Sequence, residues 1–166
     1  MMALVACAAL YGCDTATTDV LQPTELEGWK VKPKDASVAV PTDAMTTAIQ
    51  DEYRAQVTYA KVLVDFGVVK PFSNIVSAEG KHVEAISRLF VVNGLEVPAS
   101  EWNEGNVPTF ALLADACAAS VATETATAAM YDGFLLLELP SNVRKVFERL
   151  RDASALRHVR AFERCM

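Results

Sequence analysis

One stretch of the sequence, residues 78–86, places an acidic and an imidazole side chain side by side on an expected helix. Glu79 and His82 are three residues apart, so they project from the same helix face. The flanking positions of that face are apolar: Ile75, Ala78, Ile86 and Leu89. A carboxylate and an imidazole within an apolar stripe cost free energy unless a partner satisfies them. A metal ion is a partner that both groups can bind.

Three more such residues, Glu52, Glu124 and His158, lie on apolar stripes elsewhere in the chain. Each has an ordinary alternative, because a glutamate can reach solvent at a helix end and a histidine can be a hydrogen-bonded core residue. Charged residues, however, are almost never fully buried unless they are paired. Since five of these residues fall in register on four separate helices, we take all five as candidate metal ligands.

The helices that must position these ligands follow from apolar residues repeating with a period near 3.5. The predicted ranges are 43–66, 73–93, 108–137 and 141–165. Glycine and proline separate them, and no strand pattern lies between them. Four amphipathic helices predict an all-α fold, a four-helix bundle. The loop between the second and third helices could be either a short turn or a long crossover.

The two helix pairs look like copies of each other. Glu52 is followed seven residues later by Tyr59, and Glu124 is followed seven residues later by Tyr131. The pattern His-Val-x-Ala-apolar-x-Arg occurs at residues 82–88 and again at 158–164. A duplicated hairpin would bring two equivalent sets of polar residues into one core.

This constellation resembles the ferritin-like superfamily of di-iron carboxylate bundles. In that pattern one Glu comes from each of two helices and a Glu-x-x-His pair from each of the other two. The resemblance covers about residues 43–165, and the segments 51–55, 71–75 and 158–162 look like an uncharacterised bacterial branch of ferritin-like domain proteins. It implies a ferritin-like bundle with a metal site made of Glu52, Glu79, His82, Glu124 and His158.

One position departs from the pattern: Ala155 stands three residues before His158, where the family has Glu. Three interpretations follow: an asymmetric two-metal site completed by water, a single-metal site, or a bundle that keeps a metal-free polar core.

Carboxylate and imidazole ligands suit iron or manganese, and zinc is also compatible. The resemblance implies redox work at one or two iron ions, either oxidising Fe(II) with dioxygen or peroxide or consuming peroxide. Tyr59 and Tyr131 would either hold the ligands in place through hydrogen bonds or simply fill the core. The competing hypothesis is a metal-free, lipid-tethered helical module with a structural or partner-binding role.

Cys117 and Cys165 fall in the register of two candidate ligands. In an antiparallel hairpin centred on Ser141, two residues lie level when their numbers add to about 282. Glu124 and His158 meet this condition. The two cysteines add to the same number. They could therefore form a disulfide in an oxidising compartment, or remain two buried thiols.

The N-terminal segment, residues 1–13, is almost entirely apolar or small and ends at Cys13. Residues 10–13 resemble the cleavage box of a bacterial lipoprotein signal, which makes Cys13 a lipidation candidate. Tyr11 is bulky for such a box and a basic segment is absent, so a stray cysteine in an apolar N-terminus is the alternative. The signal would place the protein in the cell envelope, periplasmic or tethered to a membrane.

Length and charge narrow the remaining classes. The 166 residues, 52% of them hydrophobic, suit one domain at 43–166 that follows a linker at 14–42. A net charge of −6 without a dense run of Lys or Arg argues against a nucleic-acid partner. No apolar run reaches the roughly 18 residues of a membrane-spanning helix, so membrane contact is expected only through the N-terminal lipid. Oligomerisation and protein partners are left open.

Overall fold

The computed structural model describes residues 37–166. The predictions for the signal segment, Cys13 and most of the linker lie outside the described residues. Within residues 37–166 all regular structure is helical and no strand occurs, which confirms the all-α prediction. None of the helices in this part of the chain is long and apolar enough to cross a bilayer.

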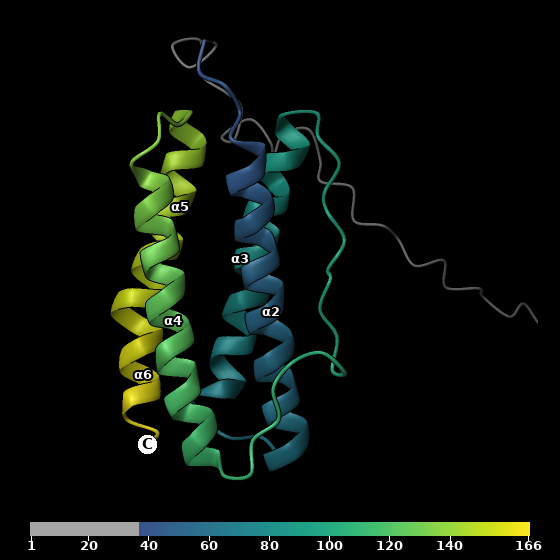
Figure 1. The fold of residues 1–166 in the computed structure, drawn as a ribbon, viewed down its shortest axis with the longest axis vertical. Coiled ribbons are helices and arrows are strands. Elements are labelled where there is room, and N and C mark those ends of the chain that lie inside the picture. The colour runs from purple at the N-terminus through teal and green to yellow at the C-terminus, as the bar shows by residue number, and fades with distance from the viewer. Residues whose placement is uncertain (1–36) are drawn as a thin grey trace, which may run out of the picture.

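Four long helical segments make up the described part of the chain, and they lie alongside one another (Figure 1). The first three are α2 (Thr42–Phe66), α3 (Phe72–Val92) and α4 (Leu113–Leu135). The fourth is continuous but changes its winding, from α5 (Ser141–Ala153) through the π-helical turn η3 (Ser154–His158) to α6 (Val159–Glu163).

The predicted bounds hold to one residue for α2 and α3, but the predicted start of the third helix at residue 108 is wrong. That helix begins at Leu113 and ends at Leu135, two residues before the predicted end. Phe110 fits the apolar spacing of the third helix, but it lies in the preceding loop and is partly buried against the core from there. Apolar spacing reports burial, and a loop residue can be buried too.

A long crossover, residues 93–112, joins two antiparallel hairpins, α2 with α3 and α4 with α5–α6. Figure 1 shows it running the length of the bundle, so that α3 and α4 point the same way. Side chains of α2 hold this segment. The Gln50 amide donates to the Ala99 carbonyl at 2.7 Å and accepts from the Glu101 N–H at 3.0 Å. The connection is thus the long crossover and not the short turn.

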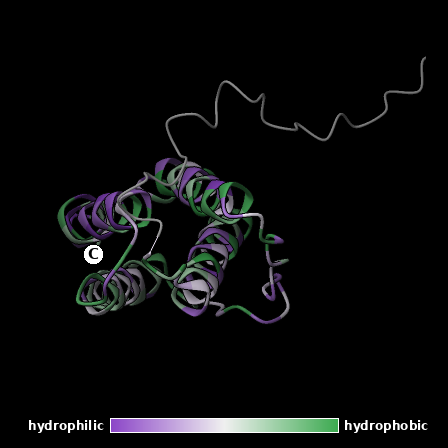
Figure 2. Ribbon diagram, turned by 90° about the horizontal axis from the view of Figure 1, so that it is seen from above, coloured by the Kyte–Doolittle hydropathy of each residue, from purple (hydrophilic) through white to green (hydrophobic). Residues whose placement is uncertain are grey.

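Two apolar clusters fill the interior around which the helices are grouped (Figure 2). The first contains Met45, Ile49, Ile86, Leu89, Phe90, Tyr131, Val143, Phe147 and Leu150, among others. The second contains Ala55, Tyr59, Val62, Phe72, Ile75, Ala116, Cys117 and Phe162. Along α2 the first cluster precedes Glu52 and the second follows it, so a polar layer separates the two apolar ones.

Candidate metal centre

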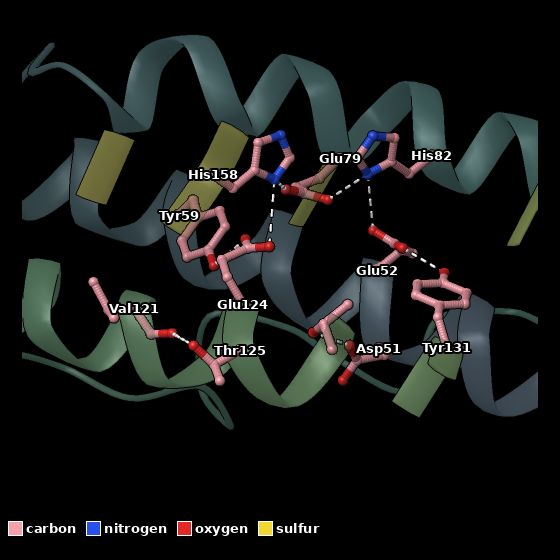
Figure 3. Close-up of polar contacts among 11 residues, drawn as sticks. Asp51, Glu52, Tyr59, Glu79, His82, Val121, Glu124, Thr125, Tyr131 and His158 are labelled. Carbon is pink, nitrogen blue, oxygen red and sulfur yellow. Dashed lines mark hydrogen bonds and ion pairs between the residues drawn. The ribbon is translucent and has the colours of Figure 1, made fainter. Parts of the chain in front are cut away.

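The polar layer consists of the five candidate ligands, which all point into the bundle interior (Figure 3). Glu52 comes from α2, Glu79 and His82 from α3, Glu124 from α4, and His158 from η3. The three carboxylates are 1–2% exposed and the imidazoles 9% and 6%. The structure therefore brings together every ligand that the sequence pattern selected, from four different helical segments.

These groups form two sets of three that share Glu79, each set with ligand atoms within 4.8 Å of one another. In the first set, His82 Nδ1 lies 2.9 Å from Glu79 Oε2 and 3.1 Å from Glu52 Oε2. In the second, His158 Nδ1 lies 3.0 Å from Glu79 Oε1 and 3.3 Å from Glu124 Oε2. Glu79 thus lies between the two imidazoles, with one oxygen toward each (Figure 3).

The separations between these atoms suit ligands of a common ion. Two atoms bound about 2.1 Å from one ion lie about 3.0 Å apart at a right angle and about 3.4 Å apart at a tetrahedral angle. The four N–O separations, from 2.9 to 3.3 Å, fall at this spacing. The residues present therefore fit a divalent ion in either set.

Two buried atoms of the second set have no hydrogen bond, although they lie 3.0 Å apart. Glu79 Oε1 and His158 Nδ1 are both shielded from solvent and neither meets hydrogen-bond geometry. Leaving a buried polar atom unsatisfied costs about 1–3 kcal/mol. An ion bound by both atoms would remove that cost.

The local electrostatics favour protonated imidazoles when no ion is bound. Burial alone would lower the pKa of His82, but its hydrogen bonds to Glu52 and Glu79 outweigh burial and raise the pKa to about 10. Burial would likewise lower the pKa of His158, but the nearby carboxylates of Glu124 and Glu79, both within ion-pair distance, outweigh burial and raise the pKa to about 9. Burial raises the pKa of Glu52 to about 7. A metal ion must therefore displace protons from the centre when it binds.

Glu52 and Glu124, the carboxylates that each belong to one ligand set only, also accept a hydrogen bond from a tyrosine. The Tyr59 hydroxyl donates to Glu124 Oε1 at 2.7 Å, and the Tyr131 hydroxyl donates to Glu52 Oε1 at 2.5 Å. Burial beside these carboxylates raises both phenol pKa values well above their ordinary value, so both remain neutral donors. The rings of the two tyrosines therefore pack in the apolar clusters, and their hydroxyls form hydrogen bonds with two of the candidate ligands.

The structure corrects the position of the missing carboxylate. A π-helical turn contains one extra residue, so the side chain on the same face as His158 lies four residues earlier instead of three. That residue is Ser154, which is 1% exposed, whereas Ala155 is partly exposed. Ser154, and not Ala155, is the counterpart of Glu79.

The neighbouring aromatic residues support this equivalence. Phe72 lies seven residues before Glu79, and its ring is 5.7 Å from that of Tyr59. Phe147 lies seven residues before Ser154, and its ring is 5.3 Å from that of Tyr131. A signal for the extra residue was present in the sequence, since ten positions separate Phe72 from His82 and eleven separate Phe147 from His158.

A second polar group beside Glu52 was not predicted. The Thr127 hydroxyl donates to Asp51 Oδ2 at 2.5 Å, which links α4 to α2. Asp51 also forms an ion pair with Arg54, whose guanidinium lies 5.8 Å from the centroid of the Trp102 ring. Asp51 thus connects α2, α4 and the crossover next to the candidate ligands without joining either ligand set.

The two disulfide candidates lie together on one side of the candidate metal centre. Cys117 and Cys165 are bonded in the structure, with their Cα atoms 5.8 Å apart. They link the first turns of α4 to the chain just after α6. Each cysteine is seven residues from a candidate ligand, Glu124 or His158, as the hairpin register requires.

Comparison with known proteins adds no family assignment: family models, curated proteins and solved structures all gave no match. Function must therefore be inferred from the centre itself.

Proposed function

We propose that this chain is a ferritin-like metal protein of the cell envelope that holds one or two divalent ions, iron or manganese, at the five-residue centre. The observation that carries the proposal is that five buried ligand groups converge, with Glu79 between the two imidazoles. Two antiparallel hairpins joined by one long crossover also match the topology of ferritin-like bundles.

Each residue has a distinct role in this proposal. Glu79 binds in both ligand sets, while Glu52 with His82 and Glu124 with His158 complete one set each. The apolar clusters on either side limit the access of water. Iron held there would supply electron transfer to or from dioxygen or peroxide, the activity that the ferritin-like resemblance implies. Zinc fits the same donors but would support no redox step.

The disulfide supports a location outside the reducing cytoplasm. Together with lipidation of Cys13, it would place the bundle on a membrane tether in the envelope. A Cys13→Ser variant expressed in a bacterial host should then leave the membrane fraction, whereas the parent chain should remain in it. Equal distribution of the two proteins would contradict the tether.

Metal content tests the main proposal. Protein purified without chelator should contain near-stoichiometric iron or manganese by elemental analysis, and Glu79→Gln should remove it because both ligand sets use Glu79. Glu84→Gln, on the exposed face of the same helix, is the matched control and should retain the metal. A native protein that contains no metal, and takes up neither Fe(II) nor Mn(II) after purification, would contradict the proposal.

One observation favours the second candidate, a metal-free module that binds a partner. Each imidazole lies within ion-pair distance of two carboxylates, so the side chains can balance one another's charges without a metal ion. Under this alternative, replacing Glu79 and His82 together would lower only the free energy of unfolding, and metal content would be nil in both proteins.

A further inference from the structure

The two halves of the centre differ at one place. The internal repeat pairs Glu52 with Glu124, His82 with His158, and Tyr131 with Tyr59 through matching contacts. The counterpart of Glu79 is Ser154, which is buried but carries a hydroxyl instead of a carboxylate. The centre therefore has one carboxylate common to both ligand sets where the repeat provides positions for two.

This difference leaves a charge imbalance when two ions are bound. Two divalent ions bring four positive charges, and the three carboxylates bring three negative ones, since metal-bound imidazoles are neutral. One positive charge remains in a layer with little solvent exposure. A buried charge of this kind is costly unless an opposite charge accompanies it.

The residue types also suggest the size of the missing group. A glutamate side chain has three more heavy atoms than a serine side chain, and a formate ion consists of three heavy atoms. The Ser154 hydroxyl can donate a hydrogen bond to such an anion. Charge, ligand type and size thus all favour a small carboxylate from solution.

We propose that a small monocarboxylate anion, of which formate is the smallest, binds beside Ser154 in the two-ion form of the centre and replaces the missing carboxylate. The inference rests on the proposed function, because it requires two bound ions. It adds a ligand site that the chain itself leaves incomplete, and for the two-ion interpretation it names an external anion, rather than water alone, as the group that completes the centre.

Formate titration of the protein loaded with Co(II) tests this site, because the visible spectrum of Co(II) changes with its ligands. We expect two Co(II) ions per chain in the presence of formate and a saturable spectral change as formate is added. Formate should tighten binding of the second ion by about tenfold, and by linkage the second ion should tighten formate binding by the same factor.

Two variants separate the position of Ser154 from that of Ala155. Ser154→Glu should bind two Co(II) ions without formate and show no spectral response to it. Ala155→Glu places the same group on a partly exposed position, so it should keep the formate response. Circular dichroism reports whether each variant folds, and the parent chain decides the question if Ser154→Glu does not.

The outcomes distinguish this inference from the proposed function. If the parent chain binds two Co(II) ions and formate leaves the spectrum unchanged, the anion site is wrong and metal binding stands. One Co(II) ion per chain, with or without formate, also overturns the anion site alone. If no Co(II) binds, the proposed function itself is overturned.

Discussion

Tyr59 and Tyr131 show how single residues position the candidate ligands. Each tyrosine is seven residues from a glutamate of its own helix, a rise of about 10 Å, which is too far for a direct hydrogen bond. Because α2 and α4 are antiparallel, Tyr59 instead lies level with Glu124, and Tyr131 lies level with Glu52. The tyrosines thus orient the carboxylates of the opposite hairpin.

Replacing Tyr131 by Phe should weaken metal binding by about 10- to 100-fold, the usual effect of losing a group that orients a ligand. The change removes the hydroxyl that donates to Glu52 Oε1 and keeps the ring in the apolar cluster. Tyr53→Phe is the matched control, since its hydroxyl donates to the Pro98 carbonyl in the crossover. Metal titration of both variants measures the effect, and equal affinities would mean that the Tyr131 hydroxyl does not position Glu52.

The shifted pKa values give the metal-free protein a definite pH dependence. A histidine whose folded pKa is raised stabilises the fold fully below its unfolded pKa of about 6.5, and this contribution is lost as pH rises through the folded pKa. For His158 and His82 the loss extends to about pH 9 and 10. Glu52, with its pKa raised to about 7, acts in the same direction between about pH 4.5 and 7. In this pH range the Glu52 carboxyl loses a proton that the folded state binds more tightly than the unfolded state does, so the free energy of unfolding falls.

We therefore expect the free energy of unfolding of chelator-treated protein to fall between pH 7 and 10, while stabilisation by added metal grows with pH as fewer protons compete. Urea unfolding at several pH values, with and without Mn(II), measures both trends. A variant with His82→Gln and His158→Gln isolates the two histidines, because all other titrating groups remain. An equal pH slope in the variant would show that the imidazoles are not the source.

At the scale of secondary structure, the sequence was sufficient to predict that four helices form and that the five candidate ligands come together, but not the start of α4 or the winding of the fourth helix. Apolar periodicity predicted α2 and α3 closely, and the repeat motif placed His158 correctly. The assumption of a regular α-helix then made Ala155 the counterpart of Glu79 in the repeat, because Glu79 and His82 are three residues apart in α3. A π-helical turn breaks that assumption, and only the longer spacing from Phe147 to His158 indicates it.

The disulfide makes a prediction at the same scale, because it fixes the end of the fourth helix to the start of α4. Its 48-residue separation gives about 4 kcal/mol of stabilisation in the loop-entropy model. Replacing Cys117 and Cys165 together by Ser should lower the free energy of unfolding by up to that amount. Denaturant unfolding measures the loss, and treating the parent protein with reductant should reproduce it. If only one of these two treatments lowers the free energy of unfolding, the loss comes from strain or from poor packing of the serines and not from the broken crosslink.

At the scale of the whole molecule, the sequence left the connection between hairpins undecided. Residues 93–112 have no periodicity, so their path depends on contacts with α2 that become visible only in three dimensions. With this topology, both hairpins contribute side chains to the polar layer. Glu52, Glu79 and His82 come from one hairpin, and Glu124 and His158 come from the other.

An ion in the second ligand set would join the two hairpins directly, since Glu79 belongs to the first while Glu124 and His158 belong to the second. Metal should therefore stabilise the entire bundle against unfolding rather than one hairpin alone. At a free metal concentration of about 100 times Kd, one site contributes about 2.7 kcal/mol, provided the unfolded chain does not bind. The expected result is a single cooperative urea transition whose midpoint rises with added Mn(II) and returns when chelator is added.

Glu79→Gln should abolish this dependence on metal, and Glu84→Gln should preserve it. Hydrogen exchange can then locate the effect, because a link between hairpins should slow exchange in α3 and α4 together. Slower exchange in α2 and α3 alone would mean that the ion uses only Glu52, Glu79 and His82, and the second ligand set would then be a metal-free ion pair. The distribution of protection between the two hairpins thus separates a centre that joins them from a site within one.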